Sequence, residues 1–220
     1  MEQVRRAGQG EAADSLAALT VALRACRICV ERPSRRELPH APNPIVQVSP
    51  TARICIASQA PGTRAHRSSI PFDDASGHRL RAWLGLTTET FYDASRIAIL
   101  PMGFCFPGQD AKGGDLPPRR ECAPHWRARI LRAIPRIELV LAIGQYAQAW
   151  HLGMHRKATL TETVAAWRDY AEAGPHPRVV PLPHPSWRNS GWLDRHPWFE
   201  RELLPFVRGE VTRCMSGEKE

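Results

Sequence analysis

The 220-residue sequence lacks a continuous apolar run of about 20 residues, the length that a membrane-spanning helix needs. It also lacks the basic stretch followed by an apolar segment that begins a secretory signal peptide. No internal repeat and no low-complexity tract is present. These absences argue against a membrane protein or a repeat array, and we expect a cytoplasmic protein.

The cysteine spacing of a disulfide framework is missing as well. Cys26 and Cys29 form a Cys-x-x-Cys pair, whereas Cys105 and Cys122 are distant single cysteines. This layout suits four thiolates around one metal centre, either an iron–sulfur cluster or zinc. A zinc module usually has two close pairs, and only one exists here. We therefore expect a reduced, intracellular chain that depends on its metal for folding.

The chain has an excess of positive charge. It carries 30 Lys and Arg residues against 22 Asp and Glu residues, which gives a net charge of +8 and a pI near 9.7. Most of these cations are arginines, whose planar fork binds phosphate. The balance hints at a polyanionic partner such as nucleic acid, although many soluble proteins are equally basic without binding one.

Apolar segments alternate with helical segments along the chain. The predicted strands lie at about 52–58, 95–102, 137–144 and 178–183. Alternation of this kind predicts an α/β protein, specifically a three-layer α/β/α fold with a central four-stranded, mainly parallel sheet. We expect a single domain over 14–208, flanked by flexible tails at 1–13 and 209–220. Cys55 lies inside the first strand as a buried structural thiol, and Cys214 lies in the tail without a role.

Unusual segments follow each predicted strand: SQAPGTRAH, PMGFCFPG, GQYAQ and LPHPSWRN. Ligands of open parallel sheets bind beyond the carboxyl ends of the strands, so these segments should be neighbours in space. Gln59 offers a donor and an acceptor to a base edge, and Pro61 and Gly62 form a tight turn beside it. His184 is held between two prolines and could donate a hydrogen bond to a developing oxyanion. An ordinary turn and a structural histidine are the alternatives.

The segment IPFDDASG precedes a helix predicted at 76–86, with Ser76 as its N-cap. Phe72 can present an aromatic face to a planar base. Asp73 and Asp74 can position water or stabilise a cation. Equally, Phe72 could belong to the core, and one aspartate could cap the helix. The sequence does not separate the two aspartates.

The last of these segments carries groups that suit nucleic acid. Ser186, Arg188 and Asn189 can contact phosphates, and Trp187 can stack on a base or wedge into a duplex.

Taken in order, these motifs resemble the uracil-DNA glycosylase superfamily, most closely its iron–sulfur branch, family 4. The ordered set is Cys26/Cys29, SQAPG, IPFDDASG, Cys105/Cys122 and LPHPSWRN, and the resemblance covers about residues 15–208. It implies a monomeric, monofunctional DNA repair enzyme that flips uracil out of DNA and hydrolyses its N-glycosidic bond.

The resemblance also implies a role for each motif. The four cysteines would ligate a [4Fe–4S] cluster. The pocket for uracil would be formed by Gln59, Ala60, Pro61, Gly62, Phe72 and Asn189. His184 would face uracil O2, with Asp73 or Asp74 acting on water. DNA would be contacted by Arg64, Ser186, Trp187 and Arg188.

The sequence departs from the family-4 pattern at several positions. The family glutamate is Gln59 and the leading glycine is Ser58. Pro101 stands where the family has the asparagine that reads uracil, and Ala60 stands where the best-known branch has its water-orienting aspartate. These changes leave room for another deaminated base, such as hypoxanthine or xanthine. A non-catalytic, metal-containing nucleic-acid-binding module is the rival outside enzymes, and a ferredoxin-like carrier is disfavoured.

Overall fold

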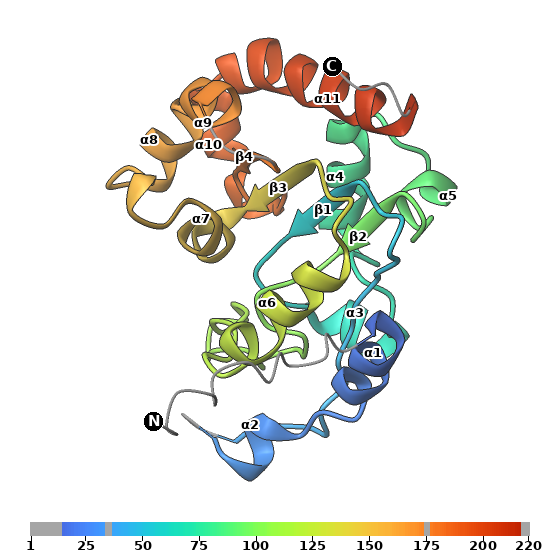
Figure 1. Ribbon diagram of the computed structural model, residues 1–220. Helices are drawn as coiled ribbons and strands as arrows, with labels where there is room; N and C mark the ends of the chain where they lie inside the picture. Colours follow the sequence, from blue (N-terminus) through green and yellow to red (C-terminus); the bar gives the residue numbers. More distant parts are fainter. Residues whose placement is uncertain (1–14, 34–36, 174–176, 217–220) are drawn as a thin grey trace, which may run out of the picture.

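The computed structural model describes residues 15–33, 37–173 and 177–216. Its centre is a four-stranded sheet in the order β2-β1-β3-β4, and all three strand pairings are parallel (Figure 1). The strands are β1 (Ile54–Ala57), β2 (Ile97–Ile99), β3 (Leu139–Ile143) and β4 (Arg178–Leu182). Helices cover both faces, so the predicted three-layer fold is confirmed.

Side-chain size differs between the two faces of the sheet. One face presents large residues such as Ile54, Ile56 and Leu141, which pack against α4 and α11. The other presents smaller residues such as Cys55 and Ala142, and the helices packed there are α1 and α6. Trp126 and Ile130 of α6 are buried in this second cluster together with the small side chains of the sheet.

The helices have these bounds: α1 (Leu16–Arg24), α2 (Ile28–Glu31), α3 (Thr63–Ser68), α4 (Ala75–Leu84), α5 (Thr88–Phe91), α6 (Cys122–Ala133), α7 (Gly144–Leu152), α8 (Leu160–Ala165), α9 (Trp167–Ala173), α10 (Ser190–Arg195) and α11 (Leu204–Ser216). A π-helical turn at Phe199–Leu203 leads directly into α11. None of the described helices is long and apolar enough to cross a membrane.

The start of α4 corrects one prediction. Its N-cap is Asp74, not Ser76, because Asp74 Oδ1 accepts a hydrogen bond from the backbone N–H of Gly77 at 2.8 Å. Ser76 therefore lies in the first turn of the helix. The capping box of α8, in contrast, forms as its sequence indicates, with Thr159 and Glu162 each accepting from the other's backbone.

The predicted C-terminal tail is also wrong over residues 209–216. α11 continues through Gly209 to Ser216, and Val211 and Cys214 are buried in the hydrophobic cluster on the first face of the sheet. This stretch is mostly polar in composition, but its few apolar residues recur at helical spacing and form one apolar face. Residues 1–13 and 217–220, the rest of the predicted tails, lie outside the described residues.

Strand order places a topological switch point at β1 and β3. The chain leaves β1 for β2 on one side and then returns across β1 to β3 and β4 on the other. Diverging connections leave a crevice at the carboxyl ends of the central strands, where ligands of such sheets bind.

Candidate active site

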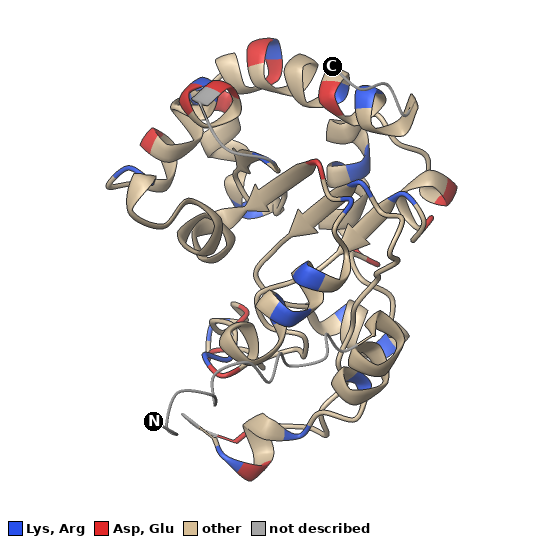
Figure 2. Ribbon diagram, in the orientation of Figure 1, with Lys and Arg blue, Asp and Glu red and all other residues tan. Residues whose placement is uncertain are grey.

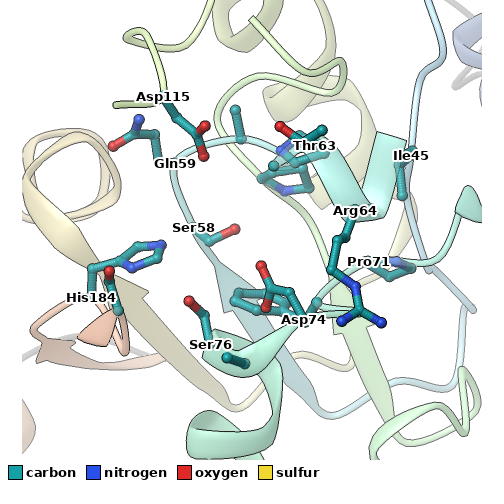
Figure 3. A pocket seen from close by; sticks show the side chains of 18 of the residues that line it. Ile45, Ser58, Gln59, Thr63, Arg64, Pro71, Asp74, Ser76, Asp115 and His184 are labelled. Carbon is teal, nitrogen blue, oxygen red and sulfur yellow. The ribbon is translucent and has the colours of Figure 1, made fainter. Parts of the chain in front are cut away.

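A cavity of about 600 Å³ opens at the carboxyl edge of the sheet (Figure 3). Its walls come from the segments after β1, β2 and β4 and from the segment that leads into α4. Parallel strands bring these segments together because all four carboxyl ends meet at one edge. The segment after β3 is the exception: GQYAQ enters α7 at once, and none of its residues lines the cavity. Gln148 supports the cavity from outside. Its side-chain amide donates to the Leu182 carbonyl at 2.9 Å and thereby holds the chain two residues before His184.

The turn after β1 forms one wall of the cavity and includes Gln59, Ala60, Pro61 and Gly62, as predicted. Its backbone is fixed to the segment after β2, because Gly103 N–H donates to the Gln59 carbonyl at 2.9 Å. The side chain of Gln59 donates from Nε2 to the Leu116 carbonyl at 3.2 Å. That bond orients the side chain and leaves the amide oxygen of Gln59 as an acceptor for a ligand.

Phe72 and Asp74 form the opposite wall. Phe72 has a φ of 56°, a left-handed conformation that is uncommon for a bulky residue. It lines the cavity, and its ring also packs edge-on against buried Phe91, with the ring centres 6.1 Å apart. The turn is locked by Gly77: a Cβ at that position would lie 1.8 Å from the Phe72 carbonyl oxygen. Capping of α4 uses Asp74 Oδ1, so the other carboxylate oxygen, Oδ2, remains available to the cavity.

His184 enters the cavity from the loop after β4 (Figure 3). Burial lowers the pKa of its imidazole, and the negative charges of Asp74 and Asp115 only partly oppose that shift. The ring is therefore neutral at pH 7 and can donate one N–H without carrying a full charge. Asn189 holds the loop in place, because its amide Nδ2 donates to the His184 carbonyl at 2.7 Å.

The mouth of the cavity carries the residues predicted to touch DNA. Trp187 is 70% exposed, and the guanidinium of Arg188 lies 5.4 Å from the centre of its ring. Ser186 and the exposed Arg64 also line the opening. Arg79 of α4 anchors this loop by donating to the Ser186 carbonyl at 3.0 Å. An exposed indole on an anchored loop is suited to insertion between bases.

Asp115 is a cavity residue that the sequence did not predict. It lies at the end of a short hairpin closed by a Gln109–Asp115 bridge, and Gln109 Nε2 donates to its Oδ1 at 3.2 Å. A Cβ added to Gly62 would lie 3.3 Å from Asp115 Oδ2 and 3.9 Å from Asp74 Oδ2, which places the two oxygens within about 7 Å of each other. Two carboxylates thus face the same space beside His184. In sequence, an aspartate beside glycines resembles an ordinary turn residue.

One predicted site residue differs from expectation. Asp73 is not among the residues that line the cavity; its charge acts on Tyr92 and helps to raise the pKa of that phenol, although burial contributes more. Asn189 lines the cavity, and one of its two amide N–H groups donates to the His184 carbonyl. Its amide therefore supports the loop, and it keeps a second N–H and a carbonyl oxygen for hydrogen bonding.

The four cysteines gather on the second face, at the side of α1, α2 and α6. Burial, and to a smaller extent the neighbouring thiols of Cys122, Cys29 and Cys26, raise the pKa of Cys105 to about 12. The pKa of Cys122 rises to about 12 for the same reasons. Trp126 Nε1 also donates to Cys26 Sγ at 3.2 Å. Three buried thiols and the half-buried thiol of Cys26, which influence one another in this way, are a chemically suitable donor set for a cationic iron–sulfur core.

Among the described residues, no group of three or more His, Cys, Asp or Glu side chains is placed to hold one metal ion. In a [4Fe–4S] cluster, each of the four cysteines would ligate a different iron.

The fold is a three-layer α/β/α sandwich, and an aromatic ring, a neutral imidazole and carboxylates line one cavity at the carboxyl edge of its parallel sheet. Residues 45–208 match the family model of the Uracil DNA glycosylase superfamily, and the chain belongs to this superfamily. It is accordingly a DNA glycosylase. Cys105 and Cys122 fall within the matched residues, whereas Cys26 and Cys29 precede them.

Proposed function

We propose that this chain removes uracil from DNA and leaves an abasic site. The observation that carries the proposal is the meeting of Phe72, Gln59 and His184 at one cavity, from three segments far apart in sequence. A base inside a duplex is out of reach of these groups, so the target nucleotide must rotate out of the stack. Phe72 would stack on the extruded base, and Trp187 would occupy the gap it leaves in the DNA.

The chemistry follows from the charges that develop. Cleavage of the C–N glycosidic bond leaves its electron pair on the base, and the sugar becomes an oxocarbenium-like cation. His184 would donate a hydrogen bond to the developing anion at O2, a type of contact worth about 2.7–4 kcal/mol. Asp74 Oδ2 and Asp115 Oδ2 would stabilise the cation and orient the water that adds to the sugar. The proton released by that water neutralises the base.

We also propose that Cys26, Cys29, Cys105 and Cys122 bind a [4Fe–4S] cluster with a structural role. Its thiolate ligands would connect the segment of α1 and α2 to α6 and to the loop after β2. The gathering of four thiols, three buried and one half-buried, supports the assignment, and the presence of only one Cys-x-x-Cys pair favours a cluster over zinc. When bound, the cluster supplies positive charge that compensates the thiolates.

The preference for uracil over another deaminated base is open, because Pro101 stands where the family has the asparagine that reads uracil. Pro101 lines the cavity, and its side chain offers no hydrogen bond to a base. The cavity of about 600 Å³ is also large enough for a purine nucleoside. Hypoxanthine or xanthine is therefore the second candidate substrate.

The test is incubation of the full chain with oligonucleotides that each carry one uracil, hypoxanthine or xanthine, followed by alkaline cleavage at abasic sites. We expect strand cleavage with uracil, and excision slowed about 100- to 1000-fold after His184→Ala. Cleavage only with a purine would assign the second candidate. DNA binding without cleavage of any substrate would instead indicate a non-catalytic binding module.

A further inference from the structure

Arg127 is a buried cation that the proposed mechanism does not use. It lies in α6, and its exposed fraction is 0%. One guanidinium nitrogen, Nη1, donates to the carbonyls of Leu100 and Pro101, the latter at 3.1 Å. The other, Nη2, lies 2.7 Å from His151 Nε2, which must accept because arginine can only donate.

No carboxylate compensates this charge within the described part of the chain. Arg127 also hydrogen-bonds the Cys55 thiol, and the centre of the Trp150 ring is 5.8 Å from the guanidinium carbon. Neither α1 nor α6 carries an acidic residue (Figure 2). Burial lowers the pKa of Arg127 to about 10, so the group remains protonated at neutral pH. An unpaired buried charge costs several kcal/mol of folding free energy. A neutral donor could make hydrogen bonds to the same carbonyls without this cost, so the charge is not needed for a structural role alone.

The position of this charge relates it to the cavity. Leu100 and Pro101 directly follow β2, and Leu100 belongs to the core beneath α6. Side chains alternate along the strand, so Ile99 and Pro101 face the other way and line the cavity. Arg127 thus binds the carbonyl of a cavity-lining residue from behind. Only the end of β2 separates the guanidinium from the space proposed for the base.

We propose that Arg127 is a positioning residue that fixes the β2 end of the cavity and places a permanent positive charge behind the departing base. The inference rests on the proposed glycosylase function. A charge in a dry interior acts over several ångströms, and it favours the state in which the bond electrons have moved onto the base. The charge is already in place before the reaction, so no reorganisation is needed.

The test compares Arg127→Gln, which keeps an N–H donor but loses the charge, with Arg127→Lys, which keeps the charge. Single-turnover excision is measured on oligonucleotides containing uracil or 5-fluorouracil, whose anion is more stable. We expect Arg127→Gln to slow uracil excision about 10- to 100-fold and 5-fluorouracil excision several-fold less. Arg127→Lys should restore most of the uracil rate. Exposed Arg132 on the same helix provides the control, because Arg132→Gln makes the same change in net charge.

A structural role alone would slow both substrates by the same factor. Equal slowing by Arg127→Gln, or an unchanged rate, would overturn the inference while leaving the glycosylase function intact. Failure of Arg127→Lys to restore the rate, although the protein is folded by circular dichroism, would also overturn it. Absence of excision by the unsubstituted chain would overturn the proposed function and this inference together.

Discussion

Substitution of Gly77 by alanine provides a direct test of how the cavity wall is built. The new Cβ would lie 1.8 Å from the Phe72 carbonyl oxygen, 2.7 Å from its carbonyl carbon and 2.9 Å from its Cβ. Non-bonded carbon–oxygen contacts rarely fall below about 3 Å, so the Phe72 backbone would have to move by more than about 1 Å. The N–H of Gly77 holds Asp74, so that carboxylate would shift as well.

The expected effect is large on activity and moderate on stability. A displacement of about 1 Å in a reacting site can reduce the rate about 100-fold. Overpacking of this kind costs about 1–3 kcal/mol of unfolding free energy. Excision is measured under single turnover, and stability by urea denaturation. Gly209→Ala is the matched control, because no atom lies within 4 Å of a Cβ there, and we expect it to be neutral or slightly stabilising. Excision at the unsubstituted rate by Gly77→Ala would refute the proposed role of this wall.

Three further predictions concern the imidazole, the thiols and pH. His184→Ala should reduce single-turnover excision about 100- to 1000-fold while DNA affinity, measured by fluorescence anisotropy, changes only a few-fold; an unchanged rate would remove His184 from the chemistry. Cys29→Ala should lose absorbance near 400 nm and soluble yield, whereas Cys214→Ala should retain the absorbance, and full absorbance in Cys29→Ala would contradict its assignment as a ligand. Burial and then Arg127 lower the pKa of His151 from 6.5 to about 3. The unfolded chain therefore binds this proton first, and stability should fall as pH drops below 6.5, by about 2 kcal/mol at pH 5 from this group. In urea titrations, the free energy of unfolding of His151→Gln should depend less on pH than that of the unsubstituted chain. An identical dependence would contradict the assignment of this effect to His151.

Sequence patterns predicted the sheet well because parallel strands are buried on both faces. Near-continuous apolar runs such as ICIA and LVLAI leave little choice of conformation. The loops at their carboxyl ends could be grouped for the same reason. This grouping predicts Gln59 and His184 at one site, the resemblance to the superfamily adds Phe72, and the structure brings all three to one cavity.

Other features depended on contacts that no local pattern records. Asp73 and Asp74 are adjacent in sequence, and only the helix cap separates them: it turns Asp74 toward the cavity while Asp73 lies near Tyr92. Asp115 reaches the site through the folding of a short hairpin. The helical continuation of α11 depends on an apolar face that becomes evident only when it packs against the core.

The sequence by itself determined the alternation of strands and helices, and it predicted both the edge of the sheet where the cavity lies and a set of four thiols for one metal centre, since each follows from local composition and spacing. Tertiary structure alone decided which carboxylates face the cavity and that an unpaired cation lies behind it. The orientation of a polar side chain is set by its hydrogen-bond partners, and those partners come from segments far away in the chain.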